Sequence, residues 1–267
     1  MAKKRGFKRG LLCGDMHCGH RVGLTPPQWQ RPTYALSDRP DAKYYKAAIA
    51  LWEAFDLKIR SLQPFDFCVV NGDCIDGKGT RSGGTELITT DRNEQCQMAE
   101  TAIRHVDADN ILITRGTGYH TGMDDDWEDQ IAHAVGADIS DHQWIDVNGV
   151  VIDCKHAVGS SSIPHGRFTP IAKDRLWNVL WHVDEGDPKS DIIIRSHVHY
   201  HAFCGDHNWL AMTLPALQGK GSKFGKRICT GTVHWGFCWV DIYDDGRYFW
   251  NRHIIQVEEQ GAQLLKW

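Results

Sequence analysis

The chain has 267 residues, of which 42% are hydrophobic, and a formal net charge of -4. This length allows one large domain with a single core, and the composition is that of an ordinary globular protein. The modest negative charge argues against a surface built mainly to hold duplex nucleic acid, although a local basic groove stays open. Because no apolar stretch approaches the roughly 20 residues of a membrane helix, and no signal-peptide pattern occurs, we expect a cytoplasmic protein that does not bind a membrane.

The first half of the chain alternates strand-like and helical patterns. Apolar runs at 10–13, 65–70 and 111–113 predict strands. Residues 20–41 are rich in Pro, Gly and polar groups and predict a long loop, whereas an apolar stripe at three- and four-residue spacing predicts a helix over 42–62. Asp91 is a suitable N-cap for a helix that runs to about Val106. The acidic residues at 124–126 favour the start of another helix, because negative charge suits a helix amino end.

The second half of the chain favours hairpins. Asn148-Gly149 between apolar runs at 144–147 and 150–153 predicts a hairpin. A helix is expected near 170–183 and a buried strand at 192–194, with further strands at 209–214, 236–243 and 248–255. No repeat or linker divides the chain. We therefore expect one mixed α/β domain over 1–267, in which two sheets pack together under helices, with residues 1–9 as a basic, flexible N-terminus.

Five short polar motifs, most of them at the end of an expected strand, carry the chemistry of the chain. They are Asp15-Met16-His17, Gly72-Asp73-Cys74-Ile75-Asp76, Gly116-Thr117-Gly118-Tyr119-His120, Lys155-His156 and Ser196-His197-Val198-His199. Open α/β folds bind ligands at one edge of the sheet, so we expect these motifs to meet there. Asp and His together suit manganese, iron or zinc. The motifs therefore predict a metal-dependent hydrolase.

In their order, these motifs resemble the pattern of the calcineurin-like metallophosphoesterase family. That pattern is D-x-H, G-D-x-x-D, G-N-H, a lone His and G-H-x-H, and its counterparts here span positions 15 to 199. The Gly-Thr-x-x-His form of the third motif is similar to that of phage-encoded members. The resemblance implies a four-layer α/β/β/α sandwich of two mixed sheets flanked by helices, which agrees with the order of elements.

The resemblance also implies a role for each matching residue. The metal ligands of the family correspond to Asp15, His17, Asp73, His156, His197 and His199. Asp73 is expected to bridge two metals, and His120 matches the histidine that faces the leaving group. Thr117 or Gly118 stands where the family has a metal-binding Asn, and two extra residues separate Gly116 from His120. The second metal is then bound more weakly, completed by water, or bound by His120.

Phosphate ester hydrolysis gives these residue types a chemical reason. Phosphate esters are anionic and repel hydroxide, and two metal ions about 3.5–4 Å apart relieve this repulsion. An anionic bridge such as Asp73 holds two cations close, and a metal-bridging hydroxide attacks phosphorus in line with the leaving oxygen. His120 is the candidate to protonate that oxygen. Mixed oxygen and nitrogen ligands favour two Mn²⁺ ions, with Fe or Zn as alternatives. Asp76 is expected to support the loop or a ligating histidine.

We therefore expect a dinuclear metal-dependent phosphodiesterase or nuclease. Thr117, Arg167 and Lys220 are candidate substrate contacts, because a guanidinium matches phosphate geometry and Lys220 begins a basic, glycine-rich loop. The alternatives within the enzyme class are a small- or cyclic-nucleotide phosphodiesterase and a phosphomonoesterase. From another class, a catalytically impaired metal-binding scaffold or a nucleic-acid-binding module stays open. The sequence names no protein partner.

Overall fold

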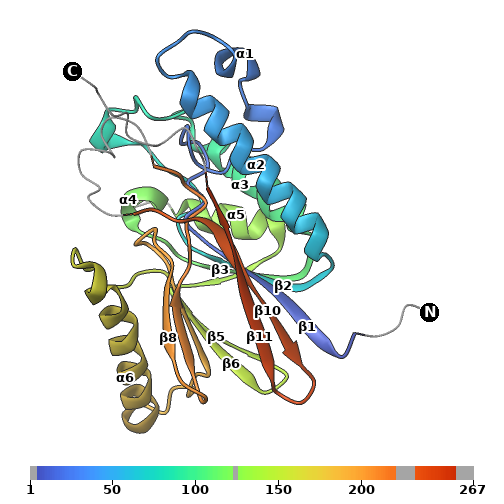
Figure 1. The fold of residues 1–267 in the computed structure, drawn as a ribbon, viewed down its shortest axis with the longest axis vertical. Coiled ribbons are helices and arrows are strands. Elements are labelled where there is room, and N and C mark those ends of the chain that lie inside the picture. The colour runs from blue at the N-terminus through green and yellow to red at the C-terminus, as the bar shows by residue number, and fades with distance from the viewer. Residues whose placement is uncertain (1–4, 123–125, 221–231, 257–267) are drawn as a thin grey trace, which may run out of the picture.

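The structure is a computed structural model that describes residues 5–122, 126–220 and 232–256. Two mixed β-sheets pack face to face, and helices cover the outer face of each (Figure 1). The result is a mixed α/β sandwich with four layers, which confirms the expected fold class. Within the described ranges, no helix is both long enough and apolar enough to cross a membrane.

The first sheet has the strand order β11-β10-β1-β2-β3-β4. Its strands are β1 (Phe7–Cys13), β2 (Phe65–Asn71), β3 (Ala108–Thr114), β4 (Asp138–Ser140), β10 (Trp235–Tyr243) and β11 (Tyr248–Ile255). The four strands from β1 to β4 run parallel, while β10 lies antiparallel to β1 and to β11. The carboxyl ends of four strands therefore meet at one edge of this sheet.

The second sheet has the order β5-β6-β7-β9-β8. Its strands are β5 (His142–Val147), β6 (Val150–Lys155), β7 (Ile192–Arg195), β8 (Ala202–Gly205) and β9 (Leu210–Thr213). The three central strands run parallel, and β5 and β8 pair antiparallel at the two edges. The turn between β5 and β6 is Asn148-Gly149, as predicted, with positive φ at both residues.

The long helices follow the apolar periodicity of the sequence. They are α2 (Ala42–Leu62), α3 (Arg92–Val106), α5 (Trp127–Val135) and α6 (Thr169–Asp184). Short helical turns occur at η1 (Pro27–Trp29), α1 (Pro32–Ala35), η2 (Thr80–Ser82), α4 (Gly118–Thr121) and η3 (Pro164–Phe168). Asp91 caps α3 through the N–H of Asn93, and Asp126 caps α5 through the N–H of Glu128. In Figure 1, α2, α3 and α5 lie on one side of the molecule and α6 on the other.

Three apolar layers hold the four structural layers together. Leu11 packs with the helices of the first sheet, while its neighbour Leu12 packs between the two sheets. This alternation explains why the central strands read as continuous apolar runs, since both of their faces are buried. A third, smaller cluster under α6 includes Ile171 and Ile193. Burial of these layers is the main force that aligns the two sheets.

Several boundaries differ from the sequence-based expectation. β1 begins at Phe7, so residues 7–9 of the segment that we assigned to a flexible N-terminus belong to a strand. There the guanidinium of Arg9 forms a bidentate ion pair with Asp241 of β10, which anchors it. The expected loop over 20–41 contains η1 and α1, and the short strands β4 and β8 were not expected. Asp124 and Asp125 lie outside the described residues.

A buried ion network joins α6 to the second sheet. Arg195 is fully buried at the end of β7. Its Nη1 donates to Asp153 Oδ1 at 2.7 Å, and its Nε donates to Asp174 Oδ2 on α6 at 2.5 Å. Asp153 also lies 2.8 Å from His142 Nε2. Each buried charge thus has a partner, and the network fixes the backbone that leads directly to His197.

We predict that Arg195→Met destabilises the protein by about 3–5 kcal/mol, because it removes the guanidinium that compensates the buried carboxylate of Asp153. Guanidinium-induced unfolding measures this change. The matched control is Arg60→Met on α2, since Arg60 is 68% exposed in its ion pair with Asp56. The control should cost less than about 1 kcal/mol. Equal losses in both variants would contradict a special role for the buried network.

Candidate metal centre

The candidate residues follow the carboxyl ends of parallel strands in both sheets. Asp15 follows β1, Asp73 follows β2, His156 follows β6 and His197 follows β7. The loops after β1 and β2 also bond to each other, since the N–H of Asp15 donates to Gly72 O at 2.9 Å. This edge is where ligands bind in open α/β sheets. The fold thereby collects residues that are far apart in the sequence.

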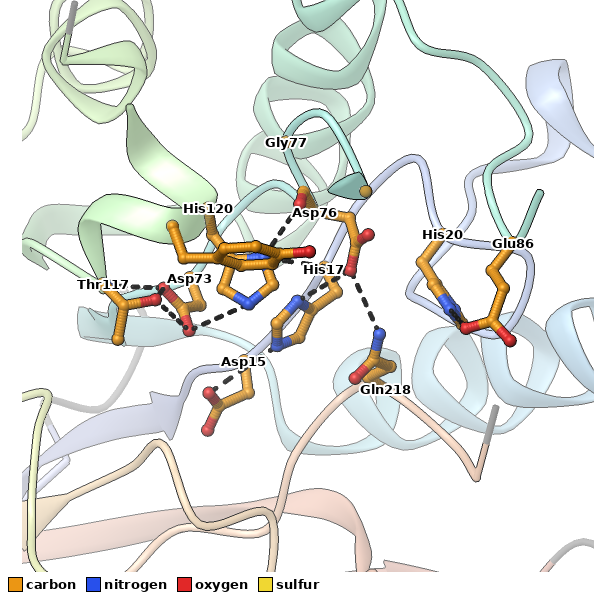
Figure 2. Close-up of polar contacts among 12 residues, drawn as sticks. Asp15, His17, His20, Asp73, Asp76, Gly77, Glu86, Thr117, His120 and Gln218 are labelled. Carbon is orange, nitrogen blue, oxygen red and sulfur yellow. Dashed lines mark hydrogen bonds and ion pairs between the residues drawn. The ribbon is translucent and has the colours of Figure 1, made fainter. Parts of the chain in front are cut away.

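The structure brings all six expected ligands together in two groups. Asp15, His17 and His199 each offer one ligand atom within 4.8 Å of one another, and so do Asp73, His156 and His197. A third group of the same kind consists of His17, Asp76 and His120. Figure 2 shows Asp15, His17, Asp73 and His120 pointing toward a common space. These groups could hold metal ions.

Three histidine rings are oriented by the hydrogen bond at Nδ1. The Nδ1–H of His17 donates to Asp76 Oδ1 at 3.1 Å. The Nδ1–H of His120 donates to the carbonyl oxygen of Asp76 at 2.8 Å, and that of His156 donates to Asn71 O at 2.7 Å. In the neutral rings the lone pair is therefore on Nε2, the nitrogen that faces the site. Metal-ligating histidines are held in this way.

Two buried atoms of the site have no hydrogen-bond partner among the described residues: Asp15 Oδ1 and His156 Nε2. They lie 4.0 Å apart. Asp15 Oδ1 is also 3.4 Å from His199 Nε2, and His156 Nε2 is 3.2 Å from Asp73 Oδ2. A buried carboxylate oxygen and a lone pair that face each other are unfavourable unless a proton or a metal cation lies between them. The donor set thus fits a metal. Asp15 Oδ1 lies within 4.0 Å of a histidine from each of the two groups.

Backbone strain is concentrated in the same loops. Of the seven non-glycine residues with positive φ in the described ranges, five are candidate ligands: Asp15, His17, Asp73, His197 and His199. Such conformations cost on the order of 1–3 kcal/mol each and cluster at functional sites. Two glycines allow these loops to pack closely against candidate ligands. A Cβ at Gly72 would lie 2.4 Å from His156 Nδ1, and one at Gly116 would lie 2.2 Å from Asp73 Oδ1.

Protons compensate the site charges when no metal is bound. Although burial opposes protonation, the nearby carboxylates of Asp15 and Asp76 raise the pKa of His17 to about 10. Burial likewise opposes protonation of His156, but the carboxylate of Asp73, 3.2 Å from Nε2, raises the pKa of His156 to about 9. Despite burial, contact with His156 holds the pKa of Asp73 well below its usual range. The site therefore concentrates negative charge that a cation can neutralise.

The third motif departs from the family pattern and takes its own geometry. Thr117 donates its N–H to Asp73 Oδ1 at 2.7 Å and its hydroxyl to the same oxygen at 3.2 Å. Thr117, expected to contact substrate, thus holds a candidate ligand. The two extra residues form the turn of α4, which brings His120 Nε2 to 4.0 Å from Asp73 Oδ2. Burial and the nearby charge of His17 lower the pKa of His120 to about 4.

The two other expected substrate contacts are Arg167 and Lys220. The guanidinium of Arg167 lies 4.4 Å from the ring centre of Tyr200, the residue after His199, and its Nη1 donates to Thr232. Lys220 is two residues from Gln218, whose Nε2 donates to Asp76 Oδ1 at 3.2 Å. The rest of the basic loop, 221–231, lies outside the described residues. For both residues, a contact with substrate stays a prediction.

Three residues of the site had no sequence signal. Asn71 accepts a hydrogen bond from His156, and Gln218 donates one to Asp76. Glu128 is fully buried, and its two carboxylate oxygens accept the N–H of Cys74 at 2.9 Å and of Gly116 at 2.7 Å. It therefore ties the second motif to the third. Acidic residues are common in a first helical turn, so its position alone gave no sign of this role.

Comparison with known proteins gives structural matches of low identity. No protein-family model and no curated protein match the sequence. A single mutant of Vps29 from Entamoeba histolytica is 14% identical, covers 93% of this chain and 99% of that chain, and has a TM-score of 0.46. Wild-type Vps29 from the same organism, complexed with Zn²⁺, is 13% identical, covers 92% and 98%, and has a TM-score of 0.44. A novel archaeal phosphodiesterase is 10% identical, covers 92% and 99%, and has a TM-score of 0.43. Function therefore has to be argued from the site itself.

We predict that Glu128→Gln destabilises the protein by about 1–3 kcal/mol and weakens metal binding. The amide can accept only one of the two backbone N–H groups and leaves the other without a partner. Chemical unfolding and metal titration measure the two effects. Glu53→Gln, on the exposed side of α2, is the matched control and should change neither quantity. Wild-type stability and metal affinity in Glu128→Gln would show that the two loops do not depend on this carboxylate.

Metal binding should release protons and strengthen as the pH rises. His17 and His156 are protonated at neutral pH in the metal-free protein, and each must lose a proton to offer its lone pair. Raising the pH through about 9 removes this competition at His156, and raising it further through about 10 removes it at His17. Calorimetric titration of Mn²⁺ or Zn²⁺ in buffers of different ionisation enthalpy should detect about two protons released.

The proton count has its own matched control. His156→Asn should reduce the release by about one proton, whereas His165→Asn, at an exposed position, should leave it unchanged. Metal binding without proton release would mean that these two imidazoles are not the ligands.

Proposed function

We propose that the protein is a metal-dependent phosphoesterase of the calcineurin-like type that acts on phosphodiesters. The observation that carries this proposal is the pair of buried, unbonded atoms, Asp15 Oδ1 and His156 Nε2, at the meeting point of two Asp/His groups. Buried polar atoms are normally hydrogen-bonded, so two unbonded atoms among facing carboxylates and imidazoles need an explanation. A site that takes up cations leaves them open toward the same space.

Each group supplies one metal position in this proposal. Asp15, His17 and His199 hold the first cation, and Asp73, His156 and His197 hold the second. The donors are oxygen and nitrogen without a thiolate, which favours Mn²⁺, with Fe or Zn as alternatives. When bound, two such cations neutralise the phosphate oxygens and activate water.

The protein side chains orient the site and handle a proton. Asp76 fixes the rings of His17 and His120 through their Nδ1–H groups. His120 is neutral in the substrate-free protein, because its pKa is lowered to about 4. An anionic phosphate beside Nε2 favours the charged imidazolium. In that form His120 can protonate the leaving oxygen, a contribution of about 10²–10⁴-fold.

The surroundings of His120 support a diester substrate. The loop that carries Lys78 and Arg81 packs against the third motif, where a Cβ at Gly77 would lie 2.7 Å from His120 O. The guanidinium of Arg81 lies 4.7 Å from the ring centre of Tyr119, which is itself 37% exposed. A cation and an accessible aromatic ring beside the candidate acid suit a substrate with a further phosphate or a base. Nucleic acid is therefore the substrate class that we propose.

The test compares bis-p-nitrophenyl phosphate with p-nitrophenyl phosphate, using metal-free protein into which Mn²⁺ is titrated. We expect Mn²⁺-dependent turnover that is faster on the diester. Asp73→Asn should lower turnover by at least about 10²-fold, because it removes a charge that holds the cations. The control is Asp109→Asn, at an exposed position of β3, which should keep wild-type activity.

Three results would redirect the proposal. Faster turnover of the monoester would favour a phosphomonoesterase. Tight metal binding without turnover of either ester would favour a metal-binding scaffold, and salt-sensitive nucleic acid binding that survives chelation would favour a binding module. Full activity of Asp73→Asn would remove the basis for a centre with two metals.

A further inference from the structure

α6 differs from the other long helices in how little of it is buried. Of its 16 residues, Ile171 and Asn178 are buried, whereas α2 buries ten of 21. Its exposed side carries Leu176 at 61%, Trp177 at 49%, Leu180 at 39% and Val183 at 72% exposure. Their three- and four-residue spacing places them on one side of the helix. We call these four residues the outer stripe of α6.

Charged residues close the outer stripe at both ends. Lys173 lies on the exposed side near the amino end of α6, and Asp184 is its last residue. Among the described residues, neither side chain takes part in an ion pair or a hydrogen bond. The helix dipole disfavours an anion at the carboxyl end. A cation near the amino end and an anion at the carboxyl end are therefore unfavourable in an isolated helix. They become favourable when a helix with the same charges lies antiparallel, because opposite charges then face each other.

We propose that the outer stripe is the contact surface of a two-fold symmetric dimer, in which α6 pairs antiparallel with α6 of a second copy. A single register pairs both the end charges and the apolar residues of the outer stripe. When Lys173 of one copy faces Asp184 of the other, Trp177 faces Leu180 of the other copy. The two-fold axis repeats each pair, which is the property of an isologous interface.

Other occupants fit this surface less well. A membrane surface with anionic lipids would be repelled by Asp184 and by Glu185, which follows it. A different protein would have to present an apolar surface and, separately, charges that complement Lys173 and Asp184. A second copy of α6 presents both in one arrangement. The helix is about 24 Å long, so the contact is smaller than the roughly 1,600 Å² of a standard interface. We therefore expect a dimer that dissociates at a concentration on the order of micromolar.

Sedimentation velocity of the full chain, from about 1 to 100 μM, tests the dimer around the expected dissociation constant. The sedimentation coefficient should rise with concentration from that of a monomer to that of a dimer. Leu176→Glu should keep the protein monomeric over this range. Leu57→Glu is the matched control, because Leu57 is an exposed leucine on α2, at 73% exposure, and should leave the dimer intact. Circular dichroism confirms that both variants are folded.

Charge exchange tests the antiparallel register. Lys173→Glu and Asp184→Lys should each weaken the dimer, by about tenfold, because each creates two like-charge contacts. The double variant restores opposite charges and should return affinity to near the wild-type value. A monomer at every concentration would overturn the proposal, as would a dimer that survives Leu176→Glu. Failure of the double variant to recover affinity, or vesicle binding by a monomer through α6, would overturn it as well.

Discussion

The candidate centre depends on one unfavourable interaction, in which imidazole lone pairs face carboxylate oxygens with no hydrogen bond between them. Asn71 and Asp76 take the Nδ1–H groups of three histidines, so that each Nε2 faces inward. There His156 Nε2 faces Asp15 and Asp73, which cannot donate a hydrogen bond to it when ionised. Only a proton or a metal relieves this arrangement. The surrounding loops, caps and glycines can be understood as what holds it in place.

The sandwich tolerates this arrangement because it is rigid elsewhere. Five candidate ligands have a left-handed backbone, and left-handed residues persist only where the surrounding structure determines their conformation. Apolar layers on both faces of the sheets supply that rigidity, and Glu128 joins two of the loops through their backbone N–H groups. The stability of the core therefore offsets the backbone strain of the centre. A looser fold would let the ligands relax apart.

Neighbouring residues of α6 lie in opposite environments. Asp174 faces inward and compensates the buried Arg195, next to the backbone that leads to His197. Lys173 faces outward beside the apolar outer stripe. The inner side of the helix is thus fixed by charge more than by apolar burial, which leaves its apolar residues free to contact another molecule. In our proposal that molecule is a second copy, whose α6 meets both the stripe and its end charges.

The sequence by itself determined the elements that depend on local pattern. The stripe of α2, the cap at Asp91 and the turn at Asn148-Gly149 are set by nearby residues, and the strand ends located the candidate ligands. Only the tertiary structure decided which nitrogen of each histidine faces the centre, and that Glu128 joins two loops. It also decided the pairing of the short strands β4 and β8. These features depend on partners distant in the chain, and no periodicity or local propensity records where such partners meet.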